Sequence, residues 1–283
     1  MIIRAPAKLN LCLFVGPARD DGLHELASLF EPLELADELS VAEADGPEDE
    51  VIVEGVEQPD LTARALAALR EAGWQRAPLR IEVRKRVPVA AGLGGGSADA
   101  AAVLRLARGE VEGLRAIASG LGADVPSQLD PRACLVVGAG EIVEPIPPPE
   151  EHGVVLIPFE QGLATAEVYA EADRLGSTRS EAELEVFRRK LRDATVEESS
   201  PLAYPENLVN DLEPAALSLR PEISGALEAL REAGAARALV TGSGPTAFGL
   251  FEDRAAAESA ASTLQSSHPG AIATAPLRDG EAS

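Results

Sequence analysis

The sequence predicts an α+β fold with two domains, and three observations lead to that prediction. At 283 residues, the chain suits two domains of ordinary size or one large one. Segments with strand and helix patterns follow one another in mixed order, with hairpins rather than a regular strand–helix alternation. The segment PIPPPEEHG at 145–153 lacks periodicity and is the best candidate linker. We therefore expect one domain at 1–148 and a second at 149–283.

The first half of the chain begins with an alternating segment, KLNLCLFV at 8–15. The alternation predicts a strand with the odd-numbered residues, Leu9 to Val15, on one face and the even-numbered ones, Lys8 to Phe14, on the other. Lys8 and Asn10 would then lie about 7 Å apart on one face. Further strands are expected at 26–35, 38–44, 50–56 and 79–87, helices at 61–73, 97–108 and 111–122, and a hairpin at 133–137 and 140–146.

The second half opens with an expected strand at 154–159 and an expected helix at 165–175. An acidic stretch at 177–204 is expected to be partly helical and fully exposed. The remaining pattern predicts helices at 222–234 and 254–265, strands at 236–242, 247–251 and 271–277, and a glycine turn at 243–246.

Composition excludes several classes of function. Apolar residues make up 46% of the chain, enough for a real core, and no apolar run approaches the roughly 18 residues of a membrane span. The net charge of −22 argues against nucleic-acid partners and anionic membranes. Two cysteines do not make a disulfide framework, which favours a reducing compartment. We therefore expect a cytoplasmic protein with no nucleic-acid or membrane partner.

A glycine run separates the strand expected at 79–87 from the helix expected at 97–108. It lies in PVAAGLGGGSADAA, with glycine at position 92 and at 94–96. Glycine lets the backbone approach a ligand closely, and the free N–H groups of a helix's first turn attract an anion. The order strand, loop, helix therefore predicts a phosphate site, which a protein of net charge −22 can build without a basic surface.

Two common phosphate loops do not match this run. No lysine follows the last glycine, as the Walker pattern requires, and Ser97 stands where the dinucleotide pattern needs its third glycine. A flexible turn capped by Ser97, with Asp99 favouring the helix dipole, is the alternative interpretation.

The run closely resembles the phosphate loop of the GHMP kinases, a superfamily of small-molecule kinases. PAKLNLCL at 6–13 and VTGSGPTAF at 240–248 resemble the same superfamily in the same order, and Thr241, Gly242 and Gly244 would support the loop. The resemblance implies the two-domain GHMP kinase fold, with an N-terminal domain like ribosomal S5 domain 2 and a ferredoxin-like C-terminal domain. It also implies ATP and Mg²⁺ as cofactors, and we expect a monomer or weak homodimer.

Within the superfamily, further segments are similar to the family of 4-diphosphocytidyl-2-C-methyl-D-erythritol kinases. They are DDGLHELASLFEPLELADELSV, GADVP and NLVNDLEP. The similarity implies ATP-dependent phosphorylation of the 2-hydroxyl of a cytidyl diphosphate-linked polyol, a step of the non-mevalonate isoprenoid route. The alternatives are another GHMP kinase with a different alcohol substrate and a nucleotide-binding protein of this fold without catalysis.

Lys8 and Asp124 match the family's catalytic lysine and aspartate. The Asp124 carboxylate would accept or orient the hydroxyl proton, and the Lys8 ammonium would balance charge on the transferred phosphoryl group. From spacing alone, Asp124 better suits the cap of a short helix, and Lys8 suits an edge strand. Asn10 would bind substrate or align Lys8, or else face solvent.

Nine residues match the family's nucleotide-binding positions: Lys85, Pro88, Ala91, Gly92, Leu93, Gly94, Gly95, Gly96 and Ser97. Lys85 would lie near the ribose and phosphates, with a solvated strand end as the alternative. The Ser97 hydroxyl would face phosphate or Mg²⁺. No spacing of carboxylates or histidines predicts a firm metal ligand.

His24 and Tyr169 match residues that read the edge of the cytosine and stack on its ring, although Tyr169 suits an ordinary core position equally well. Leu23 stands where the family usually has a tyrosine, the other face of the cytosine sandwich. Asp60 replaces an asparagine beside the adenine pocket and has no amide N–H to donate. We therefore expect a working kinase with an atypical nucleobase pocket.

Overall fold

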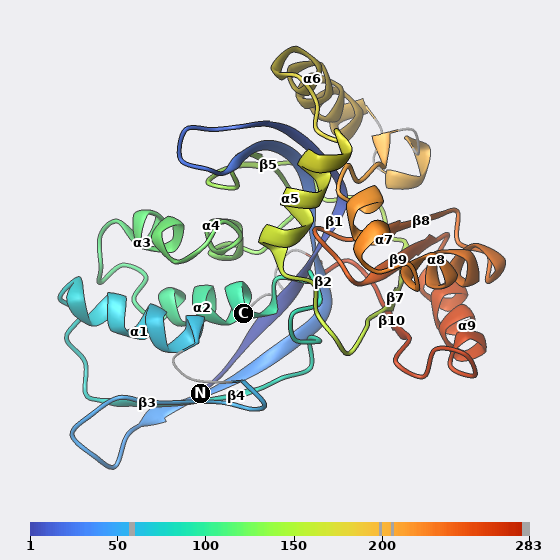
Figure 1. The fold of residues 1–283 in the computed structure, drawn as a ribbon. Coiled ribbons are helices and arrows are strands. Elements are labelled where there is room, and N and C mark those ends of the chain that lie inside the picture. The colour runs from blue at the N-terminus through green and yellow to red at the C-terminus, as the bar shows by residue number, and fades with distance from the viewer. Residues whose placement is uncertain (57–59, 198–199, 205–206, 279–283) are drawn as a thin grey trace.

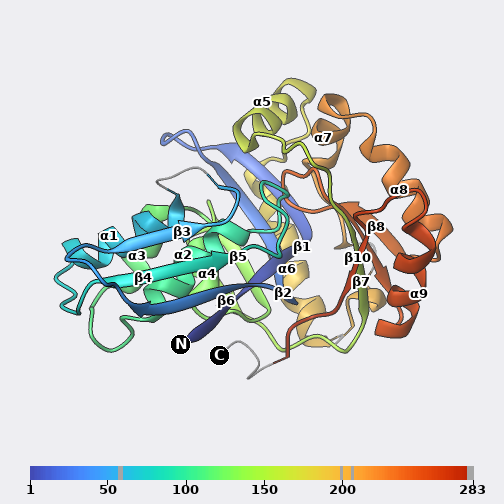
Figure 2. The ribbon, with the colours of Figure 1, turned by 90° about the horizontal axis from the view of Figure 1, so that it is seen from below.

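Two β-sheets, one from each half of the chain, organise the molecule (Figures 1 and 2). The computed structural model describes residues 1–56, 60–197, 200–204 and 207–278. Strands and helices follow one another in mixed order, with antiparallel pairing in both sheets, so the α+β prediction is confirmed. Within the described residues, no helix is both long enough and apolar enough to cross a membrane.

The first sheet holds six strands: β1 (Ile2–Ala18), β2 (His24–Glu43), β3 (Glu50–Val53), β4 (Leu79–Arg84), β5 (Cys134–Gly138) and β6 (Ile142–Pro145). Their order is β3-β4-β2-β5-β6, and β1 pairs with β2. Four helices gather beside this sheet (Figure 1): α1 (Leu61–Glu71), α2 (Gly95–Arg105), α3 (Leu114–Leu121) and α4 (Val125–Gln128). The two strands expected at 26–35 and 38–44 form one strand, because pairing with β1 continues through Ala36 and Asp37. The Asp37 side chain accepts hydrogen bonds from the Arg86 and Val87 amides.

The second sheet has the order β10-β7-β9-β8. Its strands are β7 (Gly153–Ile157), β8 (Arg237–Val240), β9 (Ala247–Phe251) and β10 (Ile272–Thr274). The helices α7 (Glu213–Leu219), α8 (Ile223–Glu232) and α9 (Arg254–Leu264) lie beside it (Figure 1). The helix α5 (Thr165–Leu175) has the predicted bounds, whereas α7 and the 3-10 turn Pro201–Ala203 were not predicted.

The predicted alternation of side chains along β1 is wrong beyond Asn10, because β1 contains a bulge there. The pairing of β1 with β2 shifts by one residue between Asn10 and Cys12, so one extra residue lies on β1. A one-residue shift reverses which face each later side chain takes. Lys8 and Asn10 do share a face, but Cys12 and Phe14 turn into the main core cluster instead of joining them. The leucine at 13 turns the other way and lines the same cavity as Lys8.

The expectation that residues 177–204 are fully exposed is wrong. The helix α6 (Glu181–Glu197) packs against β1, β2 and β5 and buries Leu184 and Leu191. Phe187 stacks on Phe14, with ring centroids 4.2 Å apart. The apolar residues of this acidic segment recur every three or four positions, which places them on one side of the helix. Residues 198–199 of the stretch lie outside the described residues.

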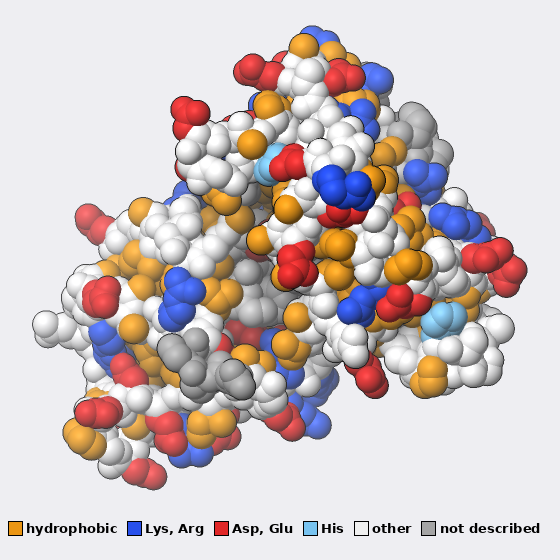
Figure 3. All heavy atoms as spheres, in the orientation of Figure 1, with side chains coloured by type: hydrophobic (Ala, Val, Ile, Leu, Met, Phe, Trp, Pro, Cys, Tyr) orange, Lys and Arg blue, Asp and Glu red, His pale blue; other side chains and the backbone are white. Residues whose placement is uncertain are grey.

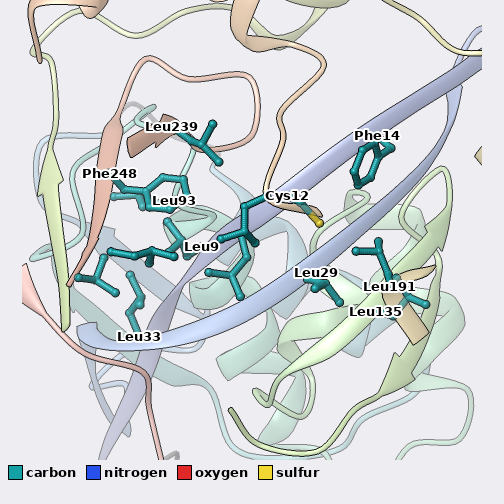
Figure 4. Close-up of a cluster of buried hydrophobic side chains, with 14 of the residues drawn as sticks. Leu9, Cys12, Phe14, Leu29, Leu33, Leu93, Leu135, Leu191, Leu239 and Phe248 are labelled. Carbon is teal, nitrogen blue, oxygen red and sulfur yellow. The ribbon is translucent and has the colours of Figure 1, made fainter. Parts of the chain in front are cut away.

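The largest apolar cluster draws on both sheets and on the glycine loop (Figure 4). Leu93, from the middle of the loop, lies with Leu9 of β1 and with Leu239 and Phe248 of the second sheet. All four side chains are less than 5% exposed. Burial of Leu93 therefore fixes the loop to the core between the two sheets. Cys12 and Cys134 are both buried free thiols.

Candidate active site

The glycine loop runs from the end of β4 into α2, and two of its positions require glycine. Gly92 has φ +78°, and a Cβ there would lie 2.8 Å from the carbonyl oxygen of Thr241. Gly94 has φ +69°, and its Cβ would lie 2.8 Å from Cγ of Lys8. The loop is thus held closely between β1 and the second glycine turn at 241–244, as the sequence predicts.

The helix α2 begins at Gly95, two residues before the expected start. Gly94 precedes it in a left-handed conformation, and no side chain caps the helix. The alternative of a turn capped by Ser97 is therefore wrong. The first backbone N–H groups of a helix have no partner within it, so those at 95–97 are available to an anion.

A cavity of about 460 Å³, here called the α1 cavity, follows the loop on the side of α1 and β3. All nine residues predicted to bind nucleotide line it, and its apolar wall includes Val53, Val56 and Leu61. Asp60 also lines it and caps α1, since its Oδ1 accepts a hydrogen bond from the Ala63 amide at 2.9 Å. The carboxylate that departs from the family pattern thus has a structural use.

A second cavity of about 310 Å³, the β1 cavity, lies on the other side of the loop and is lined by Lys8, Asn10, Asp124 and Tyr169 among others. Gly92, Gly94, Ser97 and Thr165 line both cavities, so the loop is their common wall. Figure 3 shows the surface hollowed between the two halves of the molecule.

Lys8 connects the loop with Asp124. Its Nζ donates to Oδ1 of Asn10 at 2.5 Å and to the Gly92 carbonyl at 3.1 Å, and lies 3.5 Å from Oδ2 of Asp124. Lys8 is only 4% exposed, which rules out the solvated edge-strand interpretation. Asp124 precedes α4 but makes no capping hydrogen bond, so its carboxylate is directed to Lys8 rather than to the helix.

Asn10 is buried and does not face solvent. Its side-chain Nδ2 donates to Oγ of Ser28 at 2.9 Å, and its backbone N–H donates to Oγ1 of Thr241 at 3.0 Å. Because these bonds fix the amide, its Oδ1 points at the Lys8 ammonium. Asn10 therefore aligns the lysine and ties β1 to the second glycine turn.

Lys85 is held by two buried carboxylates and is not a solvated strand end. Its Nζ lies 2.5 Å from Oδ2 of Asp37 and 2.7 Å from Oδ2 of Asp99. Burial works against its charge, but the two carboxylates outweigh burial and raise the pKa of Lys85. Burial also raises the pKa of Asp99 to about 7, with Lys85 acting in the opposite direction, and Oδ1 of Asp99 has no hydrogen-bond partner.

His24 and Tyr169 lie together, with ring centroids 5.2 Å apart. Tyr169 packs on the cluster around Leu13 and also lines the β1 cavity, so its two interpretations are compatible. His24 lies behind it, with Nδ1 3.1 Å from the Gly16 carbonyl and Nε2 3.3 Å from Oδ2 of Asp173. Leu23 is 53% exposed beside this pair.

Sequence reasoning missed three polar residues that support the site, Asp37, Ser28 and Asp173. It considered Asp99 only for the helix dipole and not as a partner of Lys85. A charged residue inside an apolar strand pattern, as at Asp37, is a usable signal, because a buried carboxylate needs a partner. Neither Ser28 nor Asp173 carries such a signal. Among the described residues, no group of three or more His, Cys, Asp or Glu side chains could hold a metal ion.

Comparison with known proteins shows the family of this chain. The model of the GHMP kinases N terminal domain matches residues 60–125, which include the loop and Asp124. The model of the GHMP kinases C terminal region matches residues 199–270, which include the second glycine turn. A 4-diphosphocytidyl-2-C-methyl-D-erythritol kinase of Kineococcus radiotolerans is 40% identical, covering 93% of this chain and 85% of that protein.

Solved structures give the same picture. The crystal structure of a 4-(cytidine 5′-diphospho)-2C-methyl-D-erythritol kinase matches with a TM-score of 0.80 and 35% identity, covering 98% of this chain and 100% of that one. A homoserine kinase from Cytophaga hutchinsonii matches with a TM-score of 0.71 but only 16% identity, covering 98% and 94%, which shows the shared fold alone.

The chain belongs to the GHMP kinases, enzymes that phosphorylate small molecules with ATP. Within that superfamily it belongs to the family of 4-diphosphocytidyl-2-C-methyl-D-erythritol kinases, because its similarity to them extends over nearly the whole chain.

Proposed function

We propose that this chain transfers the γ-phosphoryl group of ATP to the 2-hydroxyl of 4-diphosphocytidyl-2-C-methyl-D-erythritol. The position of Lys8 carries the proposal, since its Nζ contacts both the Gly92 carbonyl of the loop, at 3.1 Å, and Asp124, at 3.5 Å. The loop separates the two cavities. A nucleotide in the α1 cavity and an alcohol in the β1 cavity would meet at this lysine.

Asp124 and Lys8 have different roles in the phosphoryl transfer. The Asp124 carboxylate accepts the proton of the 2-hydroxyl while that oxygen forms its bond to the γ-phosphorus. The bond between the γ-phosphorus and the bridging oxygen breaks, and this oxygen leaves on ADP with the electron pair. Lys8 balances negative charge on the transferred group. Because such transfers are loose, holding the hydroxyl in line contributes more than early removal of its proton.

Ser97 fits the role of oxygen donor beside a nucleotide-bound Mg²⁺. Ser97 lines both cavities. In kinases, Mg²⁺ keeps most of its contacts with phosphate oxygens and water. The nearby carboxylates of Asp37 and Asp99 are already paired with Lys85. When bound, the ion would offset charge on the phosphates.

We further propose that the enzyme works in the cytoplasm as a monomer or weak homodimer, without nucleic-acid or membrane partners. The net charge of −22 and the two buried free thiols support this proposal.

The test is ADP release from ATP and Mg²⁺ with the cytidyl substrate, mevalonate or homoserine as acceptor. We expect turnover with the cytidyl substrate and a loss of about 10²–10⁴-fold in Asp124→Asn. The control is Asp130→Asn, a nearby exposed aspartate paired with Arg132, which should keep wild-type rates. Turnover with mevalonate or homoserine instead would identify a different GHMP kinase. ATP binding without turnover on any acceptor would identify a non-catalytic protein.

A further inference from the structure

We propose that Glu141 is a positioning residue for the Asp124 carboxylate, acting through the turn at 138–141 that joins β5 to β6. The inference rests on the proposed function, in which Asp124 accepts the hydroxyl proton, and adds a residue that does not itself line either cavity. It starts from Ala139 and Gly140 of this turn, which line the β1 cavity together with Asp124.

The turn packs against the peptide group that carries Asp124. A Cβ at Gly140 would lie 2.9 Å from both the Cβ and the carbonyl oxygen of Ala123, and φ of Gly140 is +119°. That carbonyl belongs to the peptide bond between Ala123 and Asp124. On the side of α4, the Asp124 carbonyl accepts a hydrogen bond from Oγ of Ser127 at 2.8 Å. The turn and the start of α4 therefore fix the backbone of Asp124 between them.

The Glu141 carboxylate folds back over the turn and closes it. Its Oε2 accepts a hydrogen bond from the Ala139 amide at 2.6 Å. A Cβ at Gly138 would lie 2.7 Å from Oε1 of Glu141, so glycine at 138, with φ +73°, leaves room for the carboxylate. Burial opposes the charge, but hydrogen bonds from backbone amides and from Arg19 lower the pKa of Glu141. The turn is thus closed by a charge-assisted hydrogen bond.

Arg19 connects this carboxylate with the turn between β1 and β2. Its Nη1 donates to Oε1 of Glu141 at 3.0 Å, and its Nη2 lies 3.0 Å from Oδ2 of Asp21. The Arg19 and Glu141 side chains are 32% and 39% exposed. An ion pair this exposed contributes little to the stability of the whole fold. Loss of Glu141 should therefore act on the local position of the turn and of the peptide packed against it.

A displaced turn should change the rate of transfer more than the binding of ATP. The Asp124 carboxylate must face the acceptor hydroxyl while its Oδ2 stays 3.5 Å from Nζ of Lys8. Misplacing a reacting group by about 1 Å can lower the rate by about 10²-fold. All four residues of the turn are described by the structure, and none of them lines the α1 cavity.

The first test measures kcat, KM and urea denaturation of Glu141→Ala. We expect kcat to fall by about 10- to 10²-fold, while KM for ATP and the free energy of unfolding stay near their wild-type values. Glu141→Gln keeps an acceptor oxygen for the Ala139 amide and should recover most of kcat. The matched control is Glu144→Ala on β6, since Glu144 is 38% exposed and paired with Arg192. A Glu141→Ala enzyme with the kcat of this control would overturn the inference.

A double-mutant cycle tests whether Glu141 acts through Asp124. In Asp124→Asn the carboxylate is already absent, so adding Glu141→Ala should lower kcat by less than about twofold further. Two losses that multiply would show that Glu141 acts independently of Asp124 and would refute the proposal.

A crystallographic comparison separates this inference from the proposed function. If wild type phosphorylates mevalonate or homoserine instead, the same cycle applies with that acceptor. If no acceptor is phosphorylated, the proposed function fails, but structures of wild type and Glu141→Ala still test the support of Asp124. The distance between Nζ of Lys8 and Oδ2 of Asp124 should lengthen beyond about 4 Å in the variant, which would break the ion pair. An unchanged distance would overturn the inference whatever the enzyme phosphorylates.

Discussion

Each side of the glycine loop holds a lysine with little exposed surface, and the two lysines have different partners. On the α1 side, Lys85 lies between Asp37 and Asp99, at 2.5 and 2.7 Å, and both carboxylates are buried. On the β1 side, Lys8 has one carboxylate, Asp124, at 3.5 Å, and the Asp124 side chain is 33% exposed.

The difference indicates which lysine does chemistry. Lys85 lies between two carboxylates, which hold its ammonium in place and reduce the positive charge that it presents to an anionic ligand in the α1 cavity. Lys8 is bonded mainly to neutral oxygens, those of Asn10 and Gly92, and its charge remains available to a phosphoryl group. We infer that Lys85 mainly stabilises the structure around the loop through Asp37 and Asp99, whereas Lys8 contacts the transferred phosphoryl group.

The largest effect on stability is expected for Lys85→Met. Removing one partner of a buried ion pair costs about 3–5 kcal/mol, and here two buried carboxylates would lose their partner. Urea denaturation should therefore show a large loss in the free energy of unfolding. A variant as stable as wild type would show that Lys85 is not a structural residue, and the comparison between the lysines would fail.

Lys8→Met should lower kcat by about 10²–10³-fold, the usual cost of removing one group that stabilises transition-state charge. Its stability should change by only about 1 kcal/mol, because Asp124 is partly exposed and can be solvated again. The measurements are steady-state kinetics and urea denaturation on the same preparation. Loss of activity in proportion to loss of folded protein would contradict a chemical role.

The pH dependence of stability tests the charge excess around Lys85. The folded-state pKa of Asp99 is about 7, above its ordinary value of 3.8, so between these values the folded state binds more protons than the unfolded state. The contribution of Asp99 to the free energy of unfolding is therefore complete at low pH and declines as pH rises toward 7, by at most about 1.4 kcal/mol per pH unit. Asp99→Asn should remove this decline. Parallel stability curves for wild type and variant between pH 4 and 7 would refute it.

The smallest effect is expected at the rim of the β1 side, for Leu23→Tyr. Leu23 is 53% exposed beside His24, so a tyrosine there could supply a second stacking face for the base without disturbing the core. Stacking is worth about 1–3 kcal/mol per base, and an exposed ring should gain the lower part of that range. KM for the cytidyl substrate should fall about fivefold with kcat retained. An unchanged KM would show that the cytosine of the substrate does not bind beside position 23.

Sequence reasoning succeeded where local pattern determines structure. The helix at 165–175 has the predicted bounds, and the glycine loop follows a strand and opens a helix as expected. It failed where one residue or one packing partner decides the outcome. The bulge after Asn10 reversed the later faces of β1, and Phe14, turned inward by that bulge, stacks on Phe187 of a helix expected to be exposed.

For the site, the sequence by itself determined the residue types and their order. These are Lys8 in the first strand, Lys85 just before the glycine loop, the loop itself, and Asp124 before a short helix. Local sequence preferred a cap for Asp124 and left a solvated strand end as the alternative for Lys85. Asp124 stands at the N-cap position of α4 but its side chain makes no capping bond, and Lys85 is paired with Asp37 and Asp99. Only the tertiary structure decided the partners of each charge, because Asp37, Asp99 and Asp124 reach the lysines through contacts between segments far apart in the chain. A buried charge acts according to what surrounds it, and those surroundings exist only in the folded molecule.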